Sequence, residues 1–259
     1  MLSAVDKLQA RRTALQRDAL DPEALHAYRK AARRVAAAVQ LAQPYLTPVE
    51  FAPAFVAAAP LARGLGKIRD NDVLRGKLDE LAKLHPGVKG LRRVVPRLPK
   101  PERRRRVRAA LRRSAKRSLR KPLERALEKM DRAEADPLAL VRARARQGSR
   151  GISAASSLHR LHGLRLELKD YRYGIEALQP RPRAAEAQLA RQGHEATRVL
   201  GRILDAHLLA DASEGADAEA SHVVLQAALQ DNERARDEFR EAWMGKRWAA
   251  LVADLRRPA

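Results

Sequence analysis

The sequence has no cysteine, and aromatic residues make up only 3% of it. The lack of cysteine excludes disulfides and thiolate zinc sites. With so few rings, a core must consist of closely packed helices that have small residues at their interfaces. Hydrophobic residues are nevertheless 45% of the chain, mostly Ala, Leu and Val. These helix formers are sufficient for a core.

Long apolar runs are also missing. No uncharged apolar run approaches the ~18 residues that a membrane-spanning helix needs. The first residues, "MLSAVDKLQARR", lack the apolar stretch of a signal peptide. We therefore expect a soluble, cytoplasmic protein with no membrane partner.

Acidic residues are few relative to basic ones. The chain has 53 Lys and Arg against 31 Asp and Glu, which gives a net charge of +22. Such a charge attracts polyanions, so the candidate partners are nucleic acid, anionic lipid and inorganic polyphosphate. A GC-rich genome that favours Arg and Ala would also raise the charge, but it would scatter the cations. Clustering on particular helix faces distinguishes these explanations.

Alternating β-branched stretches, which are typical of strands, are absent as well. Proline and glycine instead punctuate a helical pattern. One helix is expected to begin with Asp21 as N-cap and Pro22 at the first helical position. A second start, "TPVE", places Glu50 at the capping-box position after Thr47. The predicted fold class is all-α.

A repeat relates the two halves of the chain. Two motifs recur in the same order, "LHAYRKAARR" as "LHGLRLELKDYRY" and "LGKIRD" as "LGRILD". His26 and Asp70 are 44 residues apart, and His162 and Asp205 are 43 residues apart. Two short matches that share one offset indicate an internal repeat.

The repeat predicts two related helical bundles. Gly and Ser collect between about Gln147 and Ser156, where we expect the boundary. The N-terminal bundle then covers residues 1–150 and the C-terminal bundle covers residues 151–259.

The histidine-led motifs place cations on one narrow helix face. A helix turns about 100° per residue, so positions 0, 3 and 7 lie within about 60° of one another. These positions hold His26, Arg29 and Arg33 in the first half, and His162, Arg165 and Lys169 in the second. Arg172 extends the second row to about 15 Å of helix. Arg34 lies about 100° from Arg33 and serves a different face.

Rows of like charge on a helix repel by a few tenths of a kcal/mol per pair. Either acids on a facing helix neutralise them, or the rows await an anion. Asp70 and Asp205 belong to the other repeated motif and are candidates for structural ion pairs with the first and second rows respectively. Two aspartates would not neutralise all of the cations.

A third basic element lies between the two rows. Residues 100–150 contain 19 Lys and Arg against six Asp and Glu. The sequence predicts one long helix from Pro101 to about Arg132. Its cationic stripe consists of Arg105, Arg108, Arg112, Lys116 and Arg120. Because nothing on this helix offsets the stripe before Glu124, an anion-binding face is favoured over a solvated charge run.

Regular rows of Lys and Arg suit a linear polyanion. Arginine forks hold phosphate oxygens bidentately, and lysines add point charges. Recognition of single-stranded nucleic acid normally adds aromatic stacking platforms, but only Tyr28 and Tyr173 lie near the rows. A phosphate chain without bases therefore fits better than DNA or RNA. A nucleoid-type nucleic-acid-binding protein is the alternative.

Motifs for catalysis are missing. The chain has no P-loop, no GxGxxG and no HExxH. Its histidines lack a carboxylate or a second histidine at ligand spacing, so we expect no metal, no cofactor and no catalytic residue. We interpret His26 and His162 as structural first, although ligand contact is open. A phosphotransferase or polyphosphatase that uses either histidine is the enzymatic alternative.

The four motifs "LHAYRKAARR", "LGKIRDNDV", "LHGLRLELKDYRYGIE" and "LGRILD" together resemble the CHAD family, the conserved histidine α-helical domain. The resemblance covers about residues 20 to 255. It implies two four-helix bundles related by pseudo-two-fold symmetry, with basic surfaces around a central groove or pore. It also implies binding of inorganic polyphosphate and, in bacteria, association with polyphosphate granules.

The resemblance extends to individual residues. It implies a binding set of His26, Arg29, Arg33, Arg34, Arg69, His162, Arg165, Lys169, Arg172 and Tyr173, with Asp70 and Asp205 in the acidic element. The chain departs from the family pattern at Ala36, where a basic residue is common, and at Leu204, where the first half has Arg69. Both departures reduce the number of cations in the basic rows.

We therefore predict a non-enzymatic polyphosphate-binding protein, associated with polyphosphate granules, that also accepts phosphate or sulfate ions. The ExExK signature of the CYTH domain, a frequent neighbour of this family, is absent, so hydrolysis would need a separate protein. An accessory role beside polyphosphate-metabolising enzymes is a further alternative to nucleic-acid binding.

Overall fold

The computed structural model describes residues 1–63, 65–113, 119–133, 136–178 and 184–256. Within these ranges the regular elements are all helical and no strand occurs. The all-α prediction is confirmed. None of the helices in these ranges combines the length and the apolar character needed to cross a membrane.

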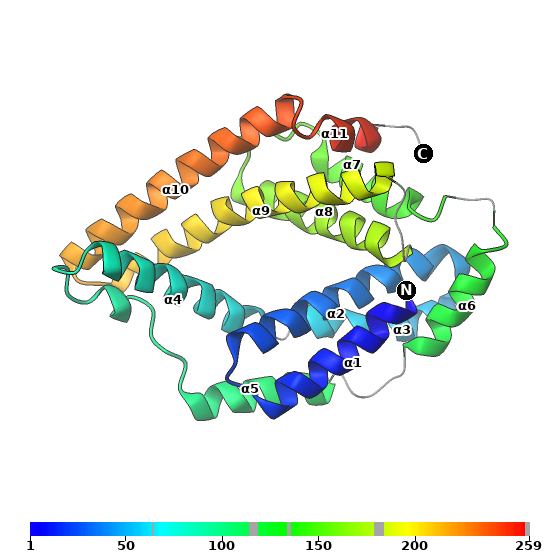
Figure 1. The fold of residues 1–259 in the computed structure, drawn as a ribbon, viewed down its shortest axis with the longest axis horizontal. Helices are drawn as coiled ribbons and strands as arrows, with labels where there is room; N and C mark the ends of the chain where they lie inside the picture. Colours follow the sequence, from blue (N-terminus) through cyan, green and yellow to red (C-terminus); the bar gives the residue numbers. More distant parts are fainter. Residues whose placement is uncertain (64, 114–118, 134–135, 179–183, 257–259) are drawn as a thin grey trace.

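The helices are numbered in chain order (Figure 1). The first half contains α1 (Leu2–Arg17), α2 (Pro22–Ala42), α3 (Pro48–Arg63), α4 (Gly66–Leu84), α5 (Lys100–Arg113), α6 (Arg120–Met130) and α7 (Ala139–Ser149). The second half contains α8 (Leu158–Leu178), α9 (Ala184–Ala212), α10 (Ala218–Met244) and α11 (Ala249–Arg256). Short 3₁₀ turns are η1 (Gln43–Tyr45), η2 (Leu91–Arg93) and η3 (Ser213–Gly215).

Both predicted helix starts are confirmed by their hydrogen bonds. The Asp21 side chain accepts a hydrogen bond of 2.8 Å from the backbone N–H of Glu23. At the start of α3, the Thr47 N–H donates to the Glu50 carboxylate at 3.0 Å, and the Glu50 N–H donates to the Thr47 hydroxyl at 3.4 Å. This reciprocal pair satisfies donors that a helix N-terminus leaves without partners.

The two histidine-led helices α2 and α8 pack against each other in the interior. Each buries an apolar face whose residues recur at three- and four-residue steps. These are Leu25, Tyr28, Ala32, Val35 and Val39 on α2, and Leu161, Leu164, Leu168 and Tyr171 on α8. Both faces belong to one continuous hydrophobic core. The repeated cations lie roughly 110° around each helix from this apolar face, so the packing of the apolar faces determines where the cations point.

Apart from α7, which lies with α8 and α11, the two halves lie on opposite sides of the molecule in Figure 1. Helices α1, α2, α3 and α5 form one side, and α8 to α11 form the other. Near residue 150, α7 packs against α8 and α11. The division at residue 150, the pseudo-two-fold relation and the four-helix bundles stay predictions.

A second, smaller core closes the end of the molecule where α4 meets α9 and α10. It contains Leu78, Leu91, Val95, Leu209, Ala220, Val224 and Ala228. Gly90 has a φ of 90° there, and an added Cβ would collide with the Asp217 side chain at the start of α10. Glycine is therefore required for the close approach of this loop to α10.

The predicted long helix between Pro101 and Arg132 is wrong as one element. α5 ends at Arg113, α6 begins at Arg120, and Leu119 before it is not helical. Pro122 explains the new start, because proline is tolerated in the first turn of a helix but not in its interior.

Candidate functional site

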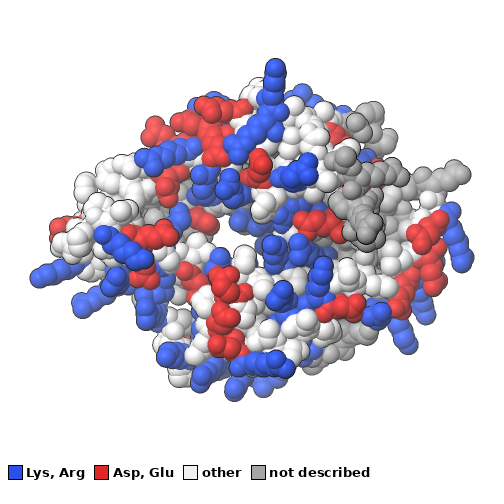
Figure 2. Space-filling model, viewed as in Figure 1, with Lys and Arg blue, Asp and Glu red and all other residues white. Residues whose placement is uncertain are grey.

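The packing of α2 on α8 brings the two cationic rows to one place. Arg33 of α2 is an electrostatic neighbour of His162, Arg165 and Lys169 of α8, whose pKa values it lowers. Arg69 of α4 likewise lowers the pKa of His26. We call this group the central cluster, and it consists of His26, Arg29, Arg33, Arg69, His162, Arg165 and Lys169. In Figure 2 the face is hollowed at its centre, and Lys and Arg side chains gather around the hollow.

The glycine of the second repeated motif lies against the arginine of the first motif in both halves of the chain. A Cβ on Gly66 would lie 3.5 Å from Nη1 of Arg29, and a Cβ on Gly201 would lie 3.1 Å from Nη2 of Arg165. Arg165 also donates from Nε to the carbonyl of Thr197 at 3.2 Å. The histidine-led motif thus supplies an arginine, and the "LG" motif supplies a helix surface flat enough for its guanidinium. Sequence analysis noted both motifs but missed this contact.

Lys169 is the most perturbed cation of the central cluster. Burial, together with the nearby guanidiniums of Arg165, Arg33 and Arg172, lowers its pKa to about 6. Among the residues that the structure describes, no carboxylate lies within 4 Å of its Nζ. Burying an ammonium among like charges without a counter-ion is unfavourable, so this arrangement suits an anion supplied from outside.

Burial also lowers the pKa of Arg29 and Arg165. Nη1 of Arg29 is buried without a hydrogen-bond partner in the described ranges. Buried donors normally have partners, so an unpartnered guanidinium N–H beside the other cations is a second sign of a missing anion.

The predicted aspartate ion pairs are not direct contacts. Neither Asp70 nor Asp205 lies within 4 Å of a cation in the part of the chain that the structure describes. Asp70 stabilises the charge of Arg29 only at longer range, and Asp205 does so for Arg165. Burial raises the pKa of Asp205 itself. Arg165 instead donates a hydrogen bond to the backbone carbonyl of Thr197. The two aspartates are therefore beyond salt-bridge distance of the arginines.

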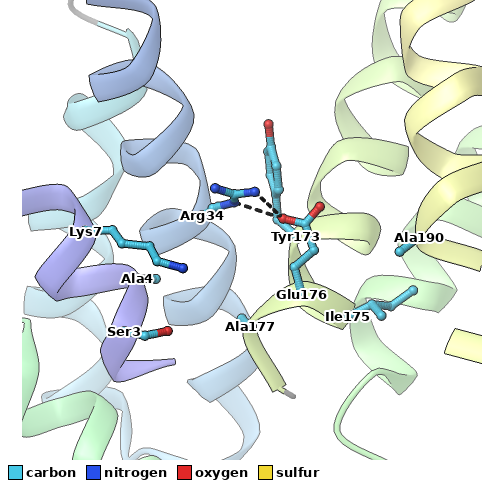
Figure 3. Close-up of a pocket in the computed structure, with 9 residues that line it drawn as sticks. All are labelled: Ser3, Ala4, Lys7, Arg34, Tyr173, Ile175, Glu176, Ala177 and Ala190. Atoms are coloured by element: carbon cyan, nitrogen blue, oxygen red, sulfur yellow. Dashed lines mark hydrogen bonds and ion pairs between the residues drawn. The ribbon is translucent and has the colours of Figure 1, made fainter. Parts of the chain in front are cut away.

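Arg34, Arg172 and Tyr173 form a separate group beside the central cluster. Figure 3 shows Arg34 and Tyr173 of this group together with Glu176. The Glu176 carboxylate accepts from Arg34 at 2.9 Å and lies 3.6 Å from Nε of Arg172. The Arg172 guanidinium stacks 4.3 Å from the Tyr173 ring centroid and also contacts His194. With only 5% of its surface exposed, Arg172 is held by neighbours of its own chain.

Arg34 and Tyr173 of this group border a cavity of about 260 Å³, which residues of α1, α2, α8 and α9 line. Lys7 of α1, which sequence analysis did not single out, lines the cavity with Arg34, Tyr173 and Glu176. The predicted binding residues Arg34 and Arg172 thus lie within 4 Å of a carboxylate, whereas the cations of the central cluster have none at that distance in the described ranges. Sequence spacing alone does not reveal this difference, because Arg34 and Glu176 are 142 residues apart.

Both repeated histidines are exposed to solvent. Partial desolvation lowers their pKa, and so do Arg69 beside His26 and Arg165 beside His162. They are therefore neutral at pH 7 and can accept or donate one hydrogen bond. No group of three metal-ligating side chains occurs in the described ranges.

The third basic element is less uniform than predicted. Arg105, Arg108 and Arg112 are exposed on α5, whereas Lys116 lies outside the described residues. Arg120 begins α6 and pairs with Asp6 at 2.9 Å and Glu124 at 3.0 Å. The predicted stripe is therefore interrupted by the break between the helices, and its last member already has carboxylate partners.

Sequence analysis missed Arg103, the one buried arginine of α5 for which the structure shows a bidentate ion pair. It binds Asp72 of α4 at 2.5 and 3.0 Å and donates to the carbonyl of Ala19 at 3.3 Å. This pair docks α5 on α4. Asp72 is an acid of the repeated "LGKIRDND" region, so its role there is structural.

The described geometry defines an all-helical protein in which two related helices present cations to one cluster. A family model, that of the CHAD domain, matches residues 1–214. The chain belongs to the CHAD domain family, which confirms the family predicted from its motifs.

Among solved structures, the fold is similar to that of PptA from Streptomyces chartreusis. The TM-score is 0.63 at 18% sequence identity, over 93% of this chain and 95% of PptA. At this identity the likeness concerns the fold. No curated protein sequence matches the chain.

Proposed function

We propose that the protein binds inorganic polyphosphate in the central cluster and does not catalyse its turnover. One observation carries the proposal. Cations from α2, α4 and α8 converge, and within the described ranges those of the central cluster have no carboxylate within salt-bridge distance. Membership of the CHAD family, which implies this ligand, supports it.

The arrangement of the cations favours a chain over a compact anion. Arg29 and Arg165 occupy equivalent positions in the two repeats, and each lies against a glycine of its own half. A ligand that extends between them gains phosphate contacts from both halves. The hollow in Figure 2 is then a basic groove that a phosphate chain follows.

Recognition by phosphate alone explains why rings are scarce at the site. Tyr173 is 4% exposed and stacked on Arg172, and Tyr28 is buried in the core. Neither ring offers a free face to a base, whereas binding of single strands relies on such faces. Because polyphosphate has no bases, the burial of these rings does not reduce its affinity.

The test compares long-chain polyphosphate with single-stranded DNA of equal charge at physiological salt. We expect the wild-type protein to bind polyphosphate more tightly. The double variant R33A/K169M removes two cations that have no partner in the described structure, and we expect it to weaken polyphosphate binding about 100-fold. Arg172 is unsuitable for this test because it is buried and contacts His194 and the Tyr173 ring, so its loss would also disturb the packing.

The matched control is R234A/R240A, which removes the same charge from exposed positions of α10. We expect its affinity to stay within about threefold of the wild type, because surface charges far from a site act weakly. Equal losses in the two double variants would mean that only net charge matters. DNA binding as tight as polyphosphate binding would favour the nucleic-acid alternative.

The non-enzymatic part of the proposal has its own measurement. Purified protein incubated with polyphosphate and Mg²⁺ should release no phosphate. Release that is lost in H26A or H162A would establish the enzymatic alternative. In cells, we propose that the protein is cytoplasmic and lies on polyphosphate granules, so a fluorescent fusion should colocalise with granules and R33A/K169M should be diffuse.

A further inference from the structure

A second group of unneutralised cations lies on another side of α4. Arg75, Arg92, Arg93 and Arg97 line a pocket of about 470 Å³ together with Pro96. Because a helix turns about 100° per residue, Arg75 lies about 120° around α4 from Arg69 of the central cluster. The two groups therefore face different directions. We call the second group the arginine pocket.

The backbone beneath the arginine pocket is fixed by the smaller core. Leu91 and Val95 are buried there, and Gly90 brings this loop against α10. Arg75 donates from Nη1 to the carbonyl of Val95 at 2.7 Å. Anchored in this way, the loop leaves Arg92, Arg93 and Arg97 exposed on one rigid scaffold.

The charge of the arginine pocket is largely uncompensated. Arg92 pairs with Asp79 at 3.2 Å. The structure, over the ranges it describes, gives the side chains of Arg93 and Arg97 no ion pair and no hydrogen bond. Four guanidiniums in one pocket repel one another unless an anion joins them.

A neighbouring pocket of about 290 Å³ extends the cationic surface. It shares Pro96 and Arg97 with the arginine pocket and adds Lys67 and Arg106. Neither pocket has an aromatic ring among its lining residues, so neither offers a stacking face for a base. Guanidinium forks without stacking faces suit phosphate groups.

We propose that the arginine pocket is a second binding site for a phosphate chain, separate from the central cluster. The choice of ligand rests on the proposed function, but the site itself rests on different residues. A long chain held at both places gains from the high effective concentration that the first contact creates.

The test counts binding sites with inorganic triphosphate as the probe, by isothermal titration calorimetry at low salt. We expect two sites in the wild type, and we expect R93A/R97A and R33A/K169M each to lose a different one. For long-chain polyphosphate, R93A/R97A should weaken binding about tenfold. The control R234A/R240A should keep both sites.

The outcomes separate this inference from the proposed function. If R93A/R97A leaves the triphosphate stoichiometry unchanged, the inference is wrong. If R93A/R97A loses a site but R33A/K169M does not, the arginine pocket stands and the central cluster fails. Single-stranded DNA is the second probe, and DNA binding lost in R93A/R97A with unchanged triphosphate binding would assign the pocket to nucleic acid and overturn the inference.

Discussion

Lys169 is the side chain of the central cluster whose pKa is shifted most by burial and by neighbouring cations. Burial first, and then Arg165, Arg33, Arg172 and Arg29, lower its pKa from 10.5 to about 6. In the unfolded chain the same group keeps its usual pKa, so between pH 6 and 10.5 the unfolded state binds the additional proton. Protein stability must therefore rise with pH across this window.

We expect K169M to be more stable than the wild type at pH 7, by on the order of 2 kcal/mol, because in the wild type folding removes the proton that the lysine keeps in the unfolded chain. The difference should shrink as the pH approaches 10.5, where the unfolded lysine also loses its proton. Urea denaturation at pH 7 and pH 9.5 measures it.

The matched control for this prediction is K246M, because Lys246 is exposed. Its stability relative to the wild type should not depend on pH. Asp170, whose pKa burial raises to about 6, and the two histidines, whose pKa values are lowered from 6.5, have mostly lost their protons above pH 7. They therefore contribute little to the change between pH 7 and pH 9.5. A K169M protein less stable than the wild type at pH 7 would contradict the prediction.

At the scale of elements, each copy of the repeat brings two helices into contact, α2 with α4 in the first half and α8 with α9 in the second. The arginine three residues after each histidine lies on the glycine of the following "LG" motif, Arg29 on Gly66 and Arg165 on Gly201. The contact is closer in the second half. An added methyl group there would push the Arg165 guanidinium away from the Thr197 carbonyl to which it donates.

We expect G201A to weaken polyphosphate binding about threefold to tenfold, because a displaced guanidinium loses part of a charge-assisted contact. Isothermal titration calorimetry checks the affinity, and urea denaturation checks that the variant folds.

Gly76 of α4 provides the control, because an added Cβ meets nothing within 4 Å there. G76A should leave the affinity unchanged and stabilise the helix by about 0.5–1 kcal/mol. If G201A binds as well as G76A, the glycine contact has no role in the site.

Between elements, some arginines form ion pairs that hold helices together, whereas the cations of the central cluster form none in the described ranges. Arg103 is buried against Asp72 and docks α5 on α4, while Arg34 and Arg172 share Glu176. Removing one partner leaves a charge uncompensated, which costs more stability for the buried Arg103 and Arg172 than for the partly exposed Arg34. Binding studies should therefore avoid these three arginines.

At the scale of the whole molecule, the net charge of +22 disfavours the compact state through self-repulsion. An anion that joins cations of both halves relieves this repulsion and binds only the folded chain. It should therefore stabilise the protein by mass action.

We expect long-chain polyphosphate at about 100 times its Kd to stabilise the fold by about 2.7 kcal/mol, which raises the Tm by about 5–10 °C for a chain of this size. Differential scanning calorimetry measures the shift. Because binding releases counter-ions, 1 M NaCl should abolish most of it. A shift of the same size in R33A/K169M would show that the central cluster is not responsible.

The sequence by itself determined what depends on local periodicity and composition. Leu25, Tyr28, Ala32, Val35 and Val39 recur in the sequence at three- and four-residue steps, the spacing of one helix face, and each of them is buried in α2. The matched motifs and the excess of Lys and Arg indicated the family and an anionic ligand. These properties follow from neighbours along the chain, which a sequence displays directly.

Only the tertiary structure decided which cations are free to bind. Arg34 is neutralised by Glu176, and Arg165 lies on Gly201, over distances along the chain that no periodicity describes. The break before Arg120 and the arginine pocket of α4 and η2 were likewise invisible in the pattern. The physical reason is that Coulomb energy depends on separations of a few ångströms and on burial, and both are set by the packing of distant segments.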